Sequence, residues 1–270
     1  MPNLFAAIFA AIFAAIGRQA IRLNDSLGEQ FLFYLEGLRQ IVSANKPWGK
    51  IFRQIYVIGY QSFFLILLIG LFTGMVLGLQ GYYLLIKFGS AGLLGAAVAL
   101  SLIRELGPVL TAIMIAGRAG SAMAAEIGVM RITDQIDALE VMDIPAMGYL
   151  VAPRLAAALI VFPLLTAVYD VIGITGGYLT GVAMLGIGEG VYFSRIESAV
   201  QLRDVIEGFI KACVFSQLVT MVCCHQGFNA HRRRDSMGPE AVGNATTSAV
   251  VISCILILMA DYVLTSFMMY

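Results

Sequence analysis

The chain has 270 residues, of which 60% are hydrophobic and 13% charged, and its mean hydropathy is +0.87. These values lie far outside the range of soluble domains and predict an all-α, polytopic membrane protein. The 17 basic and 17 acidic residues balance to a formal net charge of zero, so charge gives no support for nucleic acid as a partner.

The N-terminal stretch 4–16 repeats a four-residue apolar unit. At thirteen residues it is too short to cross a hydrocarbon layer of roughly 30 Å. Arg18 and Arg22 follow the apolar run, whereas a signal peptide has its positive charges before it. We therefore predict an N-terminal interfacial segment over 1–54, with surface helices at 4–16 and 31–41; a disordered start is the alternative.

Five apolar stretches then predict five transmembrane helices, which together form a permease domain over 55–270. The predicted spans are 55–85, 94–124, 148–184, 204–226 and 244–268. Glycines recur at four-residue spacing in the first span (Gly70, Gly74, Gly78) and in the third (Gly173, Gly177, Gly181). Small residues at this spacing let another helix approach closely, and helix packing is favoured over a dedicated dimer contact.

An amphipathic segment, Glu126 to Asp143, separates the second and third spans. Its apolar residues recur at helical spacing, so one helix is predicted here that docks by its apolar face on a soluble partner. A helix lying on lipid is the alternative, but such helices usually carry many Lys and Arg residues, and this one has five carboxylates and a single arginine. The candidate coupling residues are Glu126, Arg131, Asp134, Asp137 and Glu140.

The distribution of basic residues predicts the orientation in the membrane. Basic residues precede the first span, flank the amphipathic helix (Arg118, Arg131, Arg154) and fill the loop 232–234, whereas the opposite side has only three. The positive-inside rule then places the N-terminus and the amphipathic helix in the cytoplasm. Five spans place the C-terminus outside.

Charged residues inside the spans are the candidate substrate site, because each costs at least about 2.5 kcal/mol at a helix centre and seldom faces lipid. They are Arg104, Glu105, Glu207 and Lys211, all in the outer half of the membrane. Pro108 leaves a backbone carbonyl unbonded nearby, which predicts that this part of the helix lines a cavity or is buried in protein. A lipid phosphate bound by Arg104 and structural ion pairs of Arg104 and Glu105 with Glu207 or Lys211 remain equal alternatives; in the second case Arg104 pairs with Glu105 or Glu207.

Catalytic and metal-binding patterns are weak. Four cysteines lie in or beside apolar segments without metal-ligand spacing, which predicts neither a disulfide nor a metal. His225 and His231 are expected to be solvated in a basic loop. The sequence has no G-x-x-x-x-G-K-[ST] phosphate loop and no nucleophile–base set, so we predict a non-catalytic chain that binds no cofactor.

Several motifs resemble the permease subunit of Mla-type ABC transporters, the MlaE family. They are Arg104-Glu105-Leu106-Gly107-Pro108, the run 116–122, the run 125–131, the run 135–142 and Ala152-Pro153-Arg154, within a likeness that extends from about Phe72 to Leu264. The resemblance implies a homodimeric permease in the bacterial inner membrane that moves phospholipid between inner and outer membranes. It also implies a cytoplasmic ATPase dimer that binds ATP and magnesium, often a STAS-domain protein, and a periplasmic hexamer of MCE-domain subunits.

Two alternatives remain. A permease of the same kind could carry another amphiphile, because an apolar cavity with one cationic group accepts many. A secondary transporter would be expected to show inverted repeats and ionisable relays at the membrane midplane, and neither is evident in the sequence.

Overall fold

The computed structural model describes residues 28–30, 32–40, 48–232 and 238–268, and every regular element in these ranges is helical. Within these ranges, five helical segments are long and apolar enough to cross a membrane: Trp48–Ile86, Ala91–Ile132, Met147–Met184, Leu202–Phe228 and Pro239–Met268. The five predicted spans and the all-α membrane fold are therefore confirmed. Most spans extend beyond their predicted limits, because polar residues such as those of Trp48–Ile55 continue the same helices.

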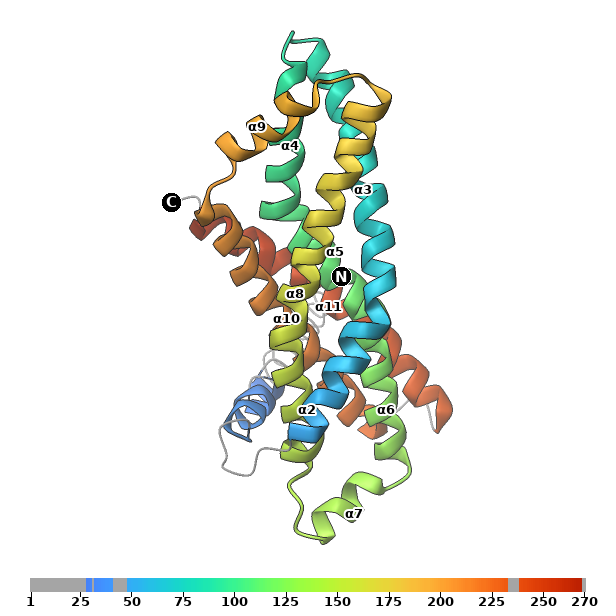
Figure 1. The fold of residues 1–270 in the computed structure, drawn as a ribbon. Helices are drawn as coiled ribbons and strands as arrows, with labels where there is room; N and C mark the ends of the chain where they lie inside the picture. The colour runs from blue at the N-terminus through green and yellow to red at the C-terminus, as the bar shows by residue number, and fades with distance from the viewer. Residues whose placement is uncertain (1–27, 31, 41–47, 233–237, 269–270) are drawn as a thin grey trace, which may run out of the picture.

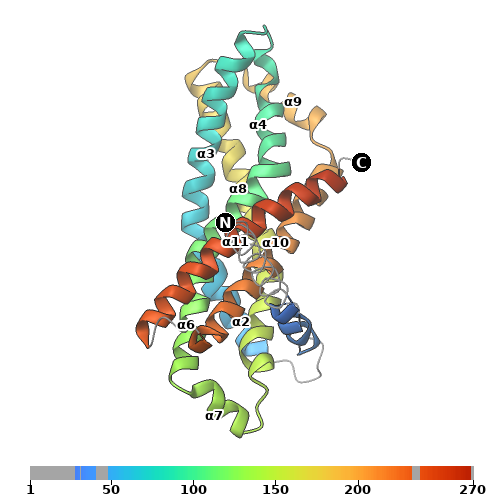
Figure 2. The ribbon, with the colours of Figure 1, turned by 180° about the vertical axis from the view of Figure 1, so that it is seen from behind.

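The spans form an elongated bundle with a short helix at each end (Figure 1). Its elements in chain order are α2 (Trp48–Ile55), η1 (Tyr56–Tyr60), α3 (Gln61–Ile86), η2 (Ala91–Leu93), α4 (Leu94–Ser101), η3 (Leu102–Leu106), α5 (Gly107–Ile115), η4 (Ala116–Gly120), α6 (Ser121–Ile132), α7 (Gln135–Val141), η5 (Met147–Val151), α8 (Ala152–Tyr178), η6 (Leu179–Met184), α9 (Glu189–Ala199), α10 (Leu202–Phe228), η7 (Ala230–Arg232) and α11 (Pro239–Met268). We call the two ends the α7 end and the α9 end. The helix α11 crosses the bundle obliquely, as Figure 2 shows.

The N-terminal helix predicted at 31–41 is present over the described residues 32–40. Phe33 and Tyr34 pack against a cluster of buried apolar side chains at the α7 end, and burial raises the pKa of the Tyr34 phenol. Its predicted place on a membrane surface stays a prediction. The stretch 4–16 lies outside the described residues.

The two predicted glycine stripes pack against each other. Gly70 lies against Tyr169, Gly74 against Gly173 and Gly78 against Gly177, so α3 and α8 meet almost backbone to backbone. A Cβ on Gly74 would lie 1.8 Å from the carbonyl oxygen of Gly173. Both stripes therefore serve packing inside one chain, and the close approach brings α3 and α8 into van der Waals contact along the bundle.

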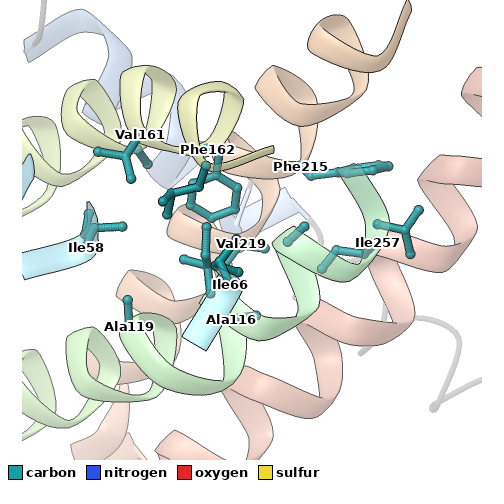
Figure 3. Close-up of a cluster of buried hydrophobic side chains, with 14 of the residues drawn as sticks. Ile58, Ile66, Ala116, Ala119, Val161, Phe162, Phe215, Val219 and Ile257 are labelled. Atoms are coloured by element: carbon teal, nitrogen blue, oxygen red, sulfur yellow. The ribbon is translucent and has the colours of Figure 1, made fainter. Parts of the chain in front are cut away.

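Apolar side chains from all five spans meet in the middle of the bundle (Figure 3). Phe162 of α8 lies near Ile58 and Ile66 of the first span, while Phe215 and Val219 come from α10. The small residues Ala116 and Ala119 of η4 leave room for these larger side chains, and Ile257 of α11 completes the cluster. This core holds the spans together below the α9 end.

Five π-helical segments interrupt the first three spans: η1, η3, η4, η5 and η6. A π-turn displaces backbone carbonyls from their usual partners and is frequent at functional sites. Arg118 in η4 donates a hydrogen bond to the carbonyl of Val57 in η1 over 2.6 Å and also bonds the side chain of Gln61. The first and second spans are thus joined where both helices are irregular.

The connection between the third and fourth spans contains α9, which the sequence analysis does not predict. Tyr192 of α9 is fully buried and donates a hydrogen bond from its hydroxyl to the carbonyl of Ile174 over 3.0 Å. Burial raises the pKa of Tyr192 to about 12, so the phenol stays a neutral donor. Gly95 of α4 lies against the Tyr192 backbone, and α9 is therefore fixed to the end of the bundle.

We expect Gly74→Ala to lower the stability of the solubilised protein by at least about 1–3 kcal/mol, because α3 and α8 must separate to admit a methyl group. Gly243→Ala is the matched control, since it also adds a methyl group to a span but meets nothing within 4 Å. The temperature at which each variant loses its monodisperse elution peak measures the effect. Equal midpoints for both variants would show that the α3–α8 contact is loose.

Candidate functional site

The candidate site begins at the irregular turn η3. Pro108 has no N–H, so the carbonyl of Arg104 receives no ordinary helical bond from it. The ammonium of Lys211 on α10 instead donates a hydrogen bond to this carbonyl over 2.9 Å. The freed carbonyl expected from the sequence is therefore present and is satisfied by a side chain from another span.

Lys211 is the hub of the polar contacts. Its side chain is 2% exposed, and its Nζ lies 2.9 Å from a carboxylate oxygen of Glu105, 3.0 Å from one of Asp261 and 2.7 Å from the hydroxyl of Thr265. Glu105 belongs to η3, whereas Asp261 and Thr265 belong to α11. One ammonium thus connects the second, fourth and fifth spans.

Arg104 pairs with Asp204, a residue absent from the predicted site. Its Nε and Nη2 donate to the same carboxylate oxygen over 2.9 and 2.6 Å. The other oxygen of Asp204 accepts the backbone N–H of Gln201 at the start of α10. The predicted pairing of Arg104 with Glu105 or Glu207 is not present, because Glu207 bonds Arg203 one turn earlier. The alternative of a structural ion pair to Lys211 is present for Glu105, over 2.9 Å.

Asp204 was missed because a carboxylate at the first turn of a helix looks like an ordinary cap. The spacing of charged residues on α10 could nevertheless have indicated it. Asp204, Glu207 and Lys211 are spaced three and four residues apart on α10 and so share one helix face. Asp261 and Thr265 lie one turn apart on α11, so they too share one helix face.

A pocket of about 290 Å³ opens where these side chains meet. It is lined by Leu100, Ser101, Arg104, Glu105, Glu207, Lys211, Thr265 and Met268. The structure therefore brings all four predicted substrate residues to one cavity. Arg104 and Glu105 remain 49% and 42% exposed, so both can meet a ligand that enters it.

The predicted continuous helix from Glu126 to Asp143 is wrong. The helix α6 ends at Ile132, and α7 begins at Gln135 after a turn in which Asp134 has a left-handed backbone with φ of 57°. Asp143, just beyond α7, has the same conformation with φ of 58°. Aspartate tolerates this region better than most residues, and apolar spacing does not reveal a turn of two residues.

The apolar face of α7 is covered mainly by the chain itself. Ile136 is fully buried against Met147, Leu150 and neighbouring apolar residues, so the chain itself covers this part of the face. Val141 and Met142 are exposed at the tip, at 88% and 64%. The carboxylates predicted for coupling at Asp134, Asp137 and Glu140 also face outward.

The other two predicted coupling residues hold the base of α7 in place. Glu126 on α6 pairs with the buried Arg154 on α8 over 2.7 Å, and Arg154 also donates to the carbonyl of Leu150 in η5. Arg131 bonds Asp137 across the turn and His231 beside it. The two helices that carry α7 are thereby tied together.

His225 is not solvated as expected. It lies within α10, is 6% exposed and packs edge-on against Phe33 at 5.3 Å between ring centroids. Its Nε2 lies 2.9 Å from the side-chain nitrogen of Asn229. His231, by contrast, is exposed, as expected for a solvated residue.

Comparison with known proteins finds relatives along nearly the whole chain. The sequence profile of the family described as "Permease MlaE" matches residues 51–267. A Haemophilus influenzae protein named "Intermembrane phospholipid transport system permease protein MlaE" is 40% identical over 94% of this chain and 95% of its own length. A Rickettsia bellii protein named "Probable ABC transporter permease protein" is 40% identical over 93% of this chain and 95% of its own length.

We expect Asp204→Asn to lower the free energy of unfolding by about 1–2 kcal/mol. The substitution weakens both the ion pair with Arg104 and the hydrogen bond that caps α10. Glu207→Gln should cost less than about 1 kcal/mol, since its partner Arg203 is largely exposed. Thermal unfolding of the two solubilised variants beside the parent protein makes the comparison. A larger loss for Glu207→Gln would contradict the assigned pairing.

Proposed function

The chain belongs to the MlaE permease family, and from this membership we propose that it is the permease subunit of an ABC transporter that moves phospholipid between the inner and outer membranes. The relative from Haemophilus influenzae, whose name specifies intermembrane phospholipid transport, carries this proposal. The charged pocket among apolar spans supports it, because a phospholipid combines a charged headgroup with apolar chains.

ATP hydrolysis is assigned to a separate ATPase dimer, which binds the nucleotide and magnesium. This chain has no phosphate-binding loop of its own. The exposed carboxylates of α7 and the apolar tip at Val141 and Met142 supply a surface for that partner. We therefore propose α7, rather than one continuous helix 126–143, as the coupling element.

The proposed setting is the bacterial inner membrane with α7 in the cytoplasm. The basic residues Arg131 and Arg154 lie at the α7 end, in agreement with the positive-inside rule. The α9 end and the C-terminus then face the periplasm, where a hexamer of MCE-domain subunits would bind. A STAS-domain protein is a further proposed partner on the cytoplasmic side.

A second copy of the chain is the remaining proposed partner. In the apolar stretch of α11 only 11% of residues are buried within the chain, and Leu258, Met259 and Tyr262 are exposed. These side chains face lipid or another protein, and an obliquely crossing helix offers a broad surface for a homodimer (Figure 2).

Transport of another amphiphile is the second candidate function, because the apolar surroundings of the pocket set no strict limit on the apolar part of the transported molecule. The exposed guanidinium of Arg104 favours a phosphate group. Asp204 uses Nε and one hydrogen of Nη2, which leaves the edge formed by Nη1 and Nη2 for a bidentate contact. A secondary transporter is disfavoured by the family membership.

We expect Arg104→Lys to lose part of the ATP-driven lipid transport of the reconstituted complex, and Arg104→Glu to lose nearly all of it. Lysine keeps the charge but cannot form the bidentate contact with phosphate. The charge-swapped variant Arg104→Asp with Asp204→Arg separates binding from structure, since it restores the ion pair at the same place. Recovery of stability without transport supports phosphate binding by Arg104; recovery of both would make Arg104 a structural residue.

Reversing the charge of Asp134, Asp137 and Glu140 together should release the ATPase while the spans stay folded, because these side chains lie on α7 or the turn before it and are exposed. Glu189→Lys with Glu197→Lys on α9 is the control at the other end. Co-purification of the ATPase, measured beside the elution profile of the permease, gives the result. Full ATPase yield with normal transport in the triple variant would remove α7 as the docking element.

A further inference from the structure

The pocket beside Arg104 has the wrong charge balance for an isolated anion. Among the described residues that line it or bond its lining, three cations (Arg104, Arg203, Lys211) face four carboxylates (Glu105, Asp204, Glu207, Asp261). A phosphate diester bound there would add a second uncompensated negative charge. A ligand that also carries one positive charge would leave the balance unchanged.

The charge balance that a ligand meets depends on exposure, because only accessible side chains contact it. Lys211 is 2% exposed, and three of its contacts are to Glu105, Asp261 and Thr265. The accessible charges of the pocket lining are therefore Arg104 at 49% and two carboxylates, Glu105 at 42% and Glu207 at 21%, with the exposed Arg203 at 68% paired to Glu207 beside the pocket. The surface offered to a ligand therefore carries both signs of charge side by side.

We propose that this pocket selects a zwitterionic phospholipid headgroup that carries both a phosphate and an ammonium group. The phosphate lies against the open edge of Arg104, and the ammonium lies between the carboxylates of Glu105 and Glu207. An anionic headgroup has no ammonium group to place between these two carboxylates. Its negative charge is therefore repelled by them, and its binding is disfavoured. This inference rests on the proposed lipid transport and names the class of lipid.

The size of the pocket agrees with a headgroup as the part recognised. Its volume of about 290 Å³ is just below the range of roughly 300–1,000 Å³ for small-molecule sites. A whole diacyl lipid does not fit, so the acyl chains remain among the apolar spans. Recognition by charge therefore takes place at the headgroup alone.

The test uses the permease–ATPase complex in nanodiscs that contain equal amounts of phosphatidylethanolamine and phosphatidylglycerol. Mass spectrometry of lipids retained after purification gives the ratio of the two. We expect the parent complex to retain phosphatidylethanolamine in excess, and Glu207→Gln to lower the ratio roughly two- to fivefold, as expected for one partly exposed ion pair. Glu105→Gln should act in the same direction.

Glu197→Gln is the matched control, because it replaces an exposed carboxylate on α9 outside the pocket and should leave the ratio unchanged. Soluble glycerophosphoethanolamine, added as a competitor, shows the source of the ligand. Displacement of lipid means that the free headgroup is bound as well; a preserved preference without displacement means that only lipid in the membrane is bound.

Equal retention of the two lipids by the parent complex, or a ratio that Glu207→Gln and Glu105→Gln leave unchanged, would overturn the proposed selectivity. ATP-driven transport of both lipids at equal rates would overturn the selectivity but leave the proposed function standing. No ATP-driven movement of any lipid by the parent complex would overturn both.

Discussion

The buried ammonium of Lys211 is the contact on which the charged half of the bundle depends. A lone ammonium in a membrane interior is costly, and here a carbonyl of η3, carboxylates from two spans and a hydroxyl surround it. Since these groups come from the second, fourth and fifth spans, their mutual positions are fixed by one atom. The segment η3, which carries Arg104 and Glu105 at the pocket, is held to α10 by this contact.

The same physical demand explains where the other internal cations lie. Inside packed helices, a backbone carbonyl displaced by a π-turn has no water to bond, so a side chain must satisfy it. Arg118 bonds a carbonyl of η1, Arg154 one of η5, and Lys211 one of η3. Three of the five π-helical segments, η1, η3 and η5, thus have a carbonyl that a cationic side chain bonds. The charges of this chain are distributed by the needs of its backbone as well as by those of a ligand.

Apolar runs, glycine spacing and in-span charges were sufficient to predict five spans, the close helix contacts and four of the eight residues that line the pocket. These features depend on local composition or on the high cost of a charge in lipid. The ion pairs were not predictable to the same degree, because Asp204 lies one hundred residues from Arg104 and its pairing depends on how α10 crosses η3. Apolar periodicity likewise placed Ile136 on a helix face but did not show that the chain covers that face.

The two left-handed aspartates on either side of α7 have a consequence for association. Asp134 and Asp143 fix the direction of a seven-residue helix at both ends by backbone geometry. A glycine at either position would fit the same shape but admit many other directions. The α7 segment would then lose its conformational entropy when the partner binds instead of during folding. This cost weakens the binding although every contact with the partner is kept. The stiffness of two backbone turns thus sets how readily the tip of α7 is recognised.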